Sequence, residues 1–192
     1  MRLALFGGAF DPIHSAHIQV GREAARRFNL DRVLFIPTAN PPHKSIPTPY
    51  EDRYRMVELA LEGEPCLEPS RLEAGTGHSY SIDTIERARD SLKPEDQLFF
   101  LIGADAFADV RTWVRWRDVI RSLEFIVVSR PGHDYKIPDG AIVHRLDNLD
   151  LPVSSTSLRD RLRRGERPAE LPGRVLAYIR DKGLYPAPVR QV

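Results

Sequence analysis

Short runs of apolar residues recur along the chain and predict strands that are buried on both faces of a sheet. They occupy residues 3–6, 32–37, 97–102 and 124–128, with residues 141–146 as a candidate fifth run. These runs are short and rich in Val, Ile, Leu and Phe, which is typical of parallel strands. The first run ends at the turn signal Gly7-Gly8. Because this run starts the chain, we expect it to lie inside the sheet rather than at an edge.

Between these runs, apolar residues recur at the spacing of amphipathic helices. In residues 16–28 an apolar residue stands at every fourth position, with arginine and glutamate between. The other helical segments are residues 50–61, 82–92, two short ones within 104–122, about 155–164 and 172–182. Residues 37–49 contain five prolines, which predicts a long loop at the carboxyl end of a strand.

Strands that alternate with helices predict an α/β fold. We expect a doubly wound, Rossmann-like parallel sheet with helices on both faces and a C-terminal helical segment. The first 37 residues form one βαβ unit with a right-handed crossover. Ligands of such folds bind outside the carboxyl ends of strands. The segments to inspect are residues 7–17, 38–44, 103–105 and the stretch from residue 129 onwards.

The composition fits one globular domain and limits the classes of ligand. The chain has 192 residues, of which 42% are apolar, enough to bury a sizeable core. Its net charge of +1 argues against wholesale binding of a nucleic-acid polymer, so any electropositive site must be local. Arginine outnumbers lysine 24 to 4, which favours forked contacts with phosphate or carboxylate where arginines converge.

Cysteine usage and hydropathy point to the cytoplasm. Cys66 is the single cysteine, so an internal disulfide and a multi-cysteine zinc site are excluded. No apolar run approaches the roughly 18 residues needed to cross a bilayer, and the stretch at residues 3–6 is too short for a signal peptide. We therefore expect a cytoplasmic protein without membrane contact, and a homo-oligomer is left open.

The segment from Gly7 to His17 carries the first candidate chemistry. Two glycines let the backbone approach a ligand, and the helix start beyond them offers free N–H groups, so phosphate is the natural occupant. The helix could start with Asp11 as its cap or with Ser15 as its cap. Either start lets His14 and His17 face the same way. A capped, solvent-exposed histidine pair and half of a metal site are the alternative interpretations.

A second candidate phosphate site lies at residues 153–159, with the sequence V-S-S-T-S-L-R. Serine and threonine in series at a helix start supply hydroxyls and free N–H groups. Arg159 lies about one turn further on, where its guanidinium can fork onto phosphate oxygens. Helix capping alone would explain the serines equally well. The arginines at positions 161, 163, 164 and 167 fit a solvent-exposed helix face.

A nicotinamide-dependent dehydrogenase is disfavoured, because Pro12 stands where the G-x-G-x-x-G pattern needs its third glycine. The first segment instead resembles the G-G-x-F-D-P-x-H-x-G-H signature of the nucleotidyltransferase superfamily that contains the nicotinate-mononucleotide adenylyltransferases. The second resembles the I-S-S-T-x-x-R motif of the same superfamily. Ala16 departs from the signature, which usually has glycine there. Aminoacyl-tRNA synthetases share the first motif, but they need a lysine-rich second motif and a longer chain.

Further matches extend the resemblance over nearly the whole chain, to the bacterial nicotinate-nucleotide adenylyltransferases. They are P-P-H-K at 41–44, S-Y-S-I-D-T at 79–84, I-G-A-D at 102–105, Trp113, S-R-P-G at 129–132 and much of 171–185. Pantetheine-phosphate adenylyltransferases share the two phosphate motifs in altered form but lack the Tyr80-Ser81 and Trp113 elements. They are the nearest enzymatic alternative. A protein that binds a nucleotide without turning it over is the alternative from another class, supported by Ala16.

The resemblance implies transfer of AMP from ATP to nicotinate mononucleotide, with release of pyrophosphate, by one nucleotidyltransferase domain over residues 1–192. We expect Mg²⁺ to be carried on the phosphates of ATP with mostly water ligands, since the sequence shows no dedicated carboxylate cage. The implied catalytic residues are His14, His17 and Arg159. The implied ATP contacts are Gly7, Gly8, Ala9, Phe10, Gly103, Asp105, Arg130, Ser154, Ser155, Thr156 and Arg159. The implied contacts to nicotinate mononucleotide are Asn40, His43, Lys44, Tyr80, Ser81 and Trp113.

Several of these residues also have a simpler interpretation. Ser81 and Asp105 fit helix caps, and residues 40–44 fit a surface loop. Trp113 offers a flat face for a pyridine ring, but taken alone it fits a core position, as does Trp116. Their arrangement in space decides between the two interpretations.

Overall fold

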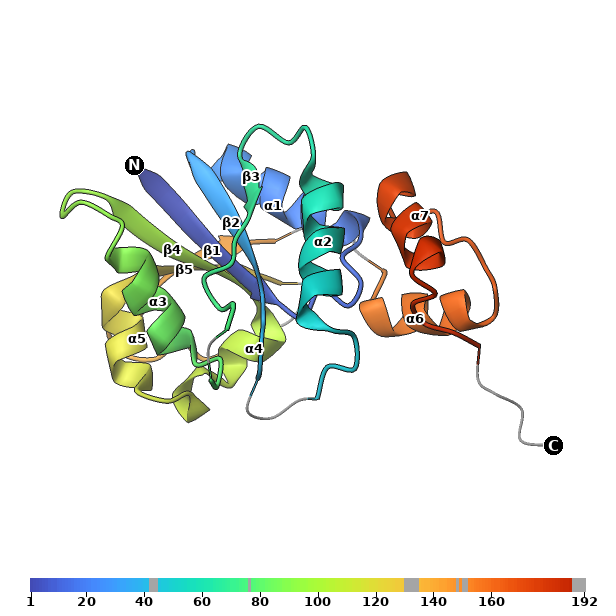
Figure 1. Ribbon diagram of the computed structural model, residues 1–192. Helices are drawn as coiled ribbons and strands as arrows, with labels where there is room; N and C mark the ends of the chain where they lie inside the picture. Colours follow the sequence, from blue (N-terminus) through green and yellow to red (C-terminus); the bar gives the residue numbers. More distant parts are fainter. Residues whose placement is uncertain (42–44, 76, 130–134, 148, 150–151, 188–192) are drawn as a thin grey trace.

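The described part of the chain forms one parallel sheet of six strands. The computed structural model describes residues 1–41, 45–75, 77–129, 135–147, 149 and 152–187. The strands are β1 (Arg2–Gly8), β2 (Arg32–Pro37), β3 (Leu67–Pro69), β4 (Gln97–Gly103), β5 (Glu124–Val128) and β6 (Ile142–Leu146). They are ordered β3-β2-β1-β4-β5-β6, and each neighbouring pair runs parallel (Figure 1).

The sheet has its topological switch point between β1 and β4. From β1 the chain moves outward through β2 to β3, and then returns to the other side of β1 to add β4, β5 and β6. Gly8 is in register with Pro37 on one side of β1, and Leu5 with Phe100 on the other. Ligands of such sheets bind beyond the carboxyl ends of the strands at this point, so the site is expected where β1 and β4 end.

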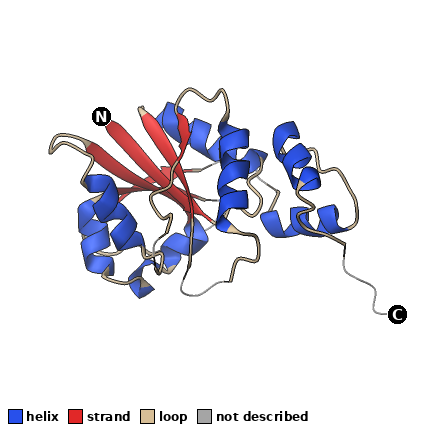
Figure 2. Cartoon of the chain, viewed as in Figure 1, coloured by secondary structure: helices blue, strands red, loops and turns tan. Residues whose placement is uncertain are grey.

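Helices cover both faces of the sheet (Figure 2). They are α1 (Ser15–Arg27), α2 (Tyr50–Leu61), α3 (Ser81–Arg89), α4 (Ala104–Ala108), the 3₁₀ turn η1 (Val110–Thr112), α5 (Trp116–Ser122), α6 (Ser155–Arg163) and α7 (Gly173–Asp181). Side chains of α1, α2, α6 and α7 share one buried apolar cluster, and those of α3, α4 and α5 share another. Because strand side chains alternate between faces, Ala4 and Phe6 join the first cluster while Leu3 and Leu5 join the second.

Of the two C-terminal helices, α7 packs beside α2 (Figure 1). The Tyr178 hydroxyl of α7 donates to Asp52 Oδ1 of α2 at 2.7 Å. Leu158 of α6 and Val175 of α7 are fully buried in the cluster shared with α1 and α2. This packing joins the C-terminal part of the chain to the cluster on one face of the sheet.

The predicted fold class is confirmed, and the first strand lies inside the sheet as expected. The sequence did not predict β3, an edge strand of three residues that ends at Pro69. A run so short lacks a readable alternation, and proline is tolerated there because an edge strand needs fewer N–H donors. None of the described helices is long and apolar enough to cross a membrane.

Candidate active site

The loop between β1 and α1, residues 9–14, is called the first loop here, and it packs the ring of Phe10 against Phe35. Gly7 is exposed at the end of β1, next to the end of β2. Gly8 leaves room for the ring of Phe10 as well as for a ligand, because a Cβ there would lie 3.1 Å from that ring. Phe10 has a positive φ of 46° and is buried, with its ring centroid 5.6 Å from that of Phe35. The second glycine is therefore required by the neighbouring ring, while the first remains open to a ligand.

His14 and His17 form a stacked pair at the start of α1. Their ring centroids are 3.8 Å apart and their planes are 30° from parallel, so the prediction that they face the same way is confirmed. Both predicted caps were wrong, because the N-cap residue of α1 is His14 itself. The backbone N–H of His14 donates to Nδ1 of His17 at 3.3 Å. In the neutral His17 ring the proton is then on Nε2, which is a donor.

Burial keeps both imidazoles neutral near pH 7. It lowers the pKa of His14 to about 4, against a smaller opposing effect of the Glu170 carboxylate. Burial also lowers the pKa of His17 well below its ordinary value, and the neighbouring His14 lowers it further. In the free protein the pair therefore offers neutral hydrogen-bonding groups rather than two cations.

The free energy of unfolding should fall as the pH is lowered through the range of these histidines. Unfolded imidazoles bind protons near pH 6.5, whereas His14 does so only near pH 4, so the unfolded state binds more protons between these values. The limiting slope is about 1.4 kcal/mol per pH unit for each histidine. Urea denaturation at several pH values between about 7 and 5 measures the slope of the free energy of unfolding against pH. A variant with both residues changed to asparagine should lose most of the slope, and an unchanged slope would contradict the neutral pair.

The start of α6 lies directly against this loop, although the two segments are far apart in the sequence. The Ser155 hydroxyl donates to the carbonyl oxygen of Pro12 at 3.0 Å, across 143 positions. Arg159 Nη1 donates to the carbonyl oxygen of Asp11 at 2.7 Å, across 148 positions. The two predicted phosphate motifs are thus brought together at one edge of the sheet.

The hydroxyls of this second motif have different tasks. Ser154 is the N-cap residue of α6, and its hydroxyl accepts the backbone N–H of Ser157 at 3.2 Å. The capping interpretation is therefore correct for Ser154. Thr156 is exposed, and Arg159 Nη2 donates to its Oγ1 at 3.2 Å. An exposed hydroxyl, a guanidinium and the first N–H groups of a helix together suit an anion.

Two buried residues to which the sequence assigned no role in the site stabilise the first loop. Arg53 of α2 is 1% exposed and donates to the carbonyl oxygens of Ala9, at 2.8 Å, and Thr48, at 3.0 Å. The hydroxyl of Tyr185 donates to Asp11 Oδ1 at 2.6 Å. Burial and the bond to Asp11 raise the pKa of Tyr185, so it remains a donor. The loop is thus fastened from α2 and from the C-terminal segment.

A cavity of about 290 Å³ adjoins the carboxyl end of β4. It is lined by Ser79, Tyr80, Ser81, Ala106, Asp109, Thr112, Trp113 and Val114. Three predicted contacts to the mononucleotide, Tyr80, Ser81 and Trp113, therefore share one cavity. Ser81 is the first residue of α3 rather than its cap, which is Tyr80. Trp113 is half-buried and packs edge-on against Phe100 at a ring distance of 5.8 Å, so it belongs partly to the core and partly to the cavity.

The proline-rich loop begins beside the same cavity. The backbone N–H of Asn40 donates to Ser79 Oγ, and the backbone N–H of Ser79 donates to the carbonyl oxygen of Asn40, both at 2.9 Å. Asn40 is exposed. Two further predicted contacts on this loop, His43 and Lys44, lie outside the described residues, as does Arg130 after β5.

The end of β4 completes this edge of the sheet. Gly103 is exposed, and a Cβ added there would meet no atom within 4 Å. Asp105 is an exposed residue of the first turn of α4 rather than its cap, which is Gly103. Ala16 is 6% exposed, so its methyl group is buried. Within the described ranges, no three His, Cys, Asp or Glu side chains come together as a metal site.

Known proteins resemble the chain over nearly its whole length. The pattern that defines the cytidylyltransferase-like family matches residues 5–161. A Solibacter usitatus protein named probable nicotinate-nucleotide adenylyltransferase is 58% identical, over 96% of this chain and 100% of that one. A Thermus thermophilus protein of the same name is 41% identical over the same shares. The Plasmodium falciparum nicotinic acid mononucleotide adenylyltransferase, solved in complex with NaAD, superposes with a TM-score of 0.79 at 19% identity, covering 96% of this chain and 97% of that one. At this identity the structural likeness concerns the fold.

Proposed function

The chain belongs to the nicotinate-nucleotide adenylyltransferases of the cytidylyltransferase-like family, and we propose on that premise that it transfers AMP from ATP to nicotinate mononucleotide. The products are nicotinate adenine dinucleotide and pyrophosphate, which makes this a step of NAD biosynthesis. The observation that carries the assignment is the contact between the two phosphate motifs, through Ser155 and Arg159 of α6. The single Cys66 fits a reducing compartment, so we place the reaction in the cytoplasm.

The reaction exchanges one phosphorus–oxygen bond for another. An oxygen of the mononucleotide's 5′-phosphate attacks the α-phosphorus of ATP. The bond from that phosphorus to the oxygen bridging the β-phosphorus breaks, and pyrophosphate leaves with the electron pair. The attacking phosphate is already a nucleophile at neutral pH, so no activated serine or cysteine is needed. The protein has to hold two anions in line and stabilise the charge that moves.

The first loop and α6 bind different phosphates of the same triphosphate. Gly7 and Gly8 admit the α-phosphate to the backbone, and His17 donates from Nε2 as charge moves toward the leaving group. His14, stacked on His17, lies at the same helix start. Arg159, Thr156 and the N–H groups of the first turn of α6 hold the departing β- and γ-phosphates. Asp105 at the end of β4 orients the adenosine ribose.

The cavity beside α3 takes the acceptor. Trp113 lines it with a half-buried indole, on which a pyridine ring can stack. The hydroxyl and N–H groups of Tyr80 and Ser81 at the helix start suit the nicotinate carboxylate. Asn40 lies next to Ser79 at the mouth of this region, where the mononucleotide's ribose and phosphate would pass.

Mg²⁺ enters with ATP in this scheme. Imidazole, hydroxyl and guanidinium groups dominate the two motifs, and these side chains suit phosphate oxygens better than a hard cation. The ion would rest on the phosphates with water as its other ligands and would neutralise part of their charge.

The assignment is tested by mixing the protein with ATP and Mg²⁺ and following pyrophosphate. We expect rapid release with nicotinate mononucleotide, slower release with nicotinamide mononucleotide and none with phosphopantetheine. Release with phosphopantetheine alone would favour the other adenylyltransferases. ATP binding without release for any acceptor would show a nucleotide-binding protein and contradict the proposal.

A further inference from the structure

Two buried polar atoms near the start of α1 are chemically complementary, and neither has a hydrogen-bond partner among the described residues. They are Nδ1 of His14 and Oε2 of Glu170. The backbone N–H of Ser15 donates to the carbonyl oxygen of Glu170 at 2.8 Å, so the glutamate is fastened to the residue that follows His14. A buried imidazole nitrogen and a buried carboxylate oxygen each lose their hydration, and one shared proton would satisfy both.

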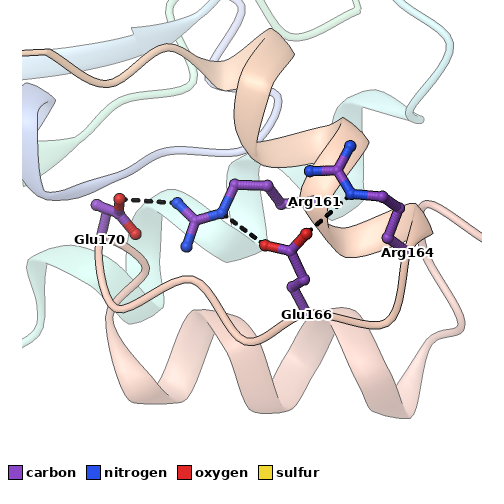
Figure 3. Close-up of polar contacts among 4 residues, drawn as sticks. All are labelled: Arg161, Arg164, Glu166 and Glu170. Carbon is purple, nitrogen blue, oxygen red and sulfur yellow. Dashed lines mark hydrogen bonds and ion pairs between the residues drawn. The ribbon is translucent and has the colours of Figure 1, made fainter.

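Glu170 is held in place by an arginine of α6 (Figure 3). Arg161 Nη1 donates to Glu170 Oε1 at 2.8 Å, and its Nε donates to Glu166 at 3.0 Å. Glu166 in turn accepts from Arg164 at 2.8 Å. A backbone N–H and Arg161 lower the pKa of Glu170, so it is an anion at neutral pH. Arg161 thus binds Oε1, while Oε2 has no hydrogen-bond partner among the described residues.

The surroundings decide which of the two histidines could accept a proton. Nδ1 of His17 already accepts the backbone N–H of His14, and protonation there would break that bond. The rings are 3.8 Å apart, so two imidazolium ions would repel one another. The Glu170 carboxylate, which Arg161 binds, opposes the effect of burial on the pKa of His14, while Arg159 of α6 binds the loop at the carbonyl oxygen of Asp11. His14 is therefore the member of the pair that has an anion to stabilise its cation.

We propose that Glu170 is a positioning residue that lets His14 become protonated when the triphosphate binds. In the complex, rotation of the Glu170 carboxylate brings its Oε2 to Nδ1–H of His14, which donates to it, and Nε2–H of His14 donates to a phosphate oxygen. The proton comes from solvent, and no other bond is made or broken. His14 is then a cation between two anions, while His17 remains a neutral donor. The inference rests on the proposed function, because the phosphates supply the second anion.

The test counts the protons taken up when the Mg²⁺ complex of α,β-methylene-ATP binds. Titration calorimetry in buffers of different ionisation enthalpy gives this number. Any change in the protonation of the nucleotide itself is the same for every variant, so it cancels when two variants are compared. Near pH 6.5 the wild-type protein should bind more protons than Glu170→Gln when the nucleotide binds, with a difference of about one proton at most. The control is Glu166→Gln, which removes the other negative charge paired with Arg161 but leaves Glu170 in place, and it should behave as the wild type.

Kinetics should separate positioning from general stability. The Glu170→Gln variant should lose about 10- to 100-fold in kcat, the range expected for a hydrogen bond to a charged group, with little change in KM for ATP. Glu170→Asp keeps the charge and should recover part of the rate. Equal proton uptake by Glu170→Gln and the wild type would overturn the inference.

A second measurement needs no variant. Nitrogen-15 NMR of the wild-type imidazoles should show both ring nitrogens of His14 protonated in the complex, and a neutral His14 there would overturn the inference. If the nucleotide analogue did not bind at all, the proposed function would fail with it. Binding with a neutral His14 overturns this inference alone.

Discussion

Replacing His17 with alanine should lower kcat by about 100- to 1000-fold while the protein still folds, as expected when one preorganised charge-stabilising donor is removed. The backbone of His14 occupies Nδ1 of His17, which leaves Nε2 as the donor to the reacting phosphate. Steady-state kinetics at saturating ATP and nicotinate mononucleotide measure the loss, and thermal unfolding followed by circular dichroism checks the fold.

A glutamine at the same position is the matched variant. The side-chain amide N–H of glutamine can replace the Nε2–H of His17 as a hydrogen-bond donor, so His17→Gln should retain more activity than His17→Ala. Unchanged turnover in the alanine variant would remove His17 from the chemical step. Equal losses in both variants would point instead to packing, since the ring lies edge-on to Phe10 at 5.1 Å and to Phe6 at 6.2 Å.

The Trp113→Ala variant should raise the KM for nicotinate mononucleotide by about 10-fold or more, with little effect on the KM for ATP. The indole lines the cavity assigned to the acceptor, and stacking of one base on an aromatic side chain is worth about 1 to 3 kcal/mol. Initial rates with each substrate varied in turn measure the two constants.

The neighbouring tryptophan provides the control for this variant. Trp116 lines a different cavity, with Arg117 and Ile120, so Trp116→Ala should leave both constants close to the wild-type values. The Trp113→Phe variant keeps an aromatic face and should fall between alanine and the wild type. An equal rise of both KM values in Trp113→Ala would argue that the indole supports the core against Phe100 rather than the pyridine ring.

Most elements of the fold could be predicted because burial dominates the apolar pattern. The predicted segments 32–37, 50–61 and 124–128 have the same bounds in the structure as β2, α2 and β5. Helix starts were less predictable, since His14 and Tyr80 hold cap positions for which serine has the higher preference. At α1 the backbone N–H of Ser15 is bound to Glu170, and no local pattern encodes that contact.

The motifs of the site could be recognised from the sequence, but their supports could not all be found there. Arg53 gave a readable signal, because it precedes Met56 and Val57 by three and four positions on the buried side of α2. Arg161 was assigned to a solvent-exposed face, yet its side chain is only 29% exposed and pairs with Glu166 and Glu170. These pairs depend on the chain folding back between α6 and α7, which sequence spacing alone does not show.

A crystal structure of the protein with Mg²⁺, α,β-methylene-ATP and nicotinate mononucleotide tests most directly whether both motifs bind one triphosphate. We expect phosphate oxygens at about 2.7 to 3.2 Å from His17 Nε2 on one side and from the Arg159 guanidinium on the other. A triphosphate that touches only one of these two groups, with the other facing solvent, would contradict this expectation.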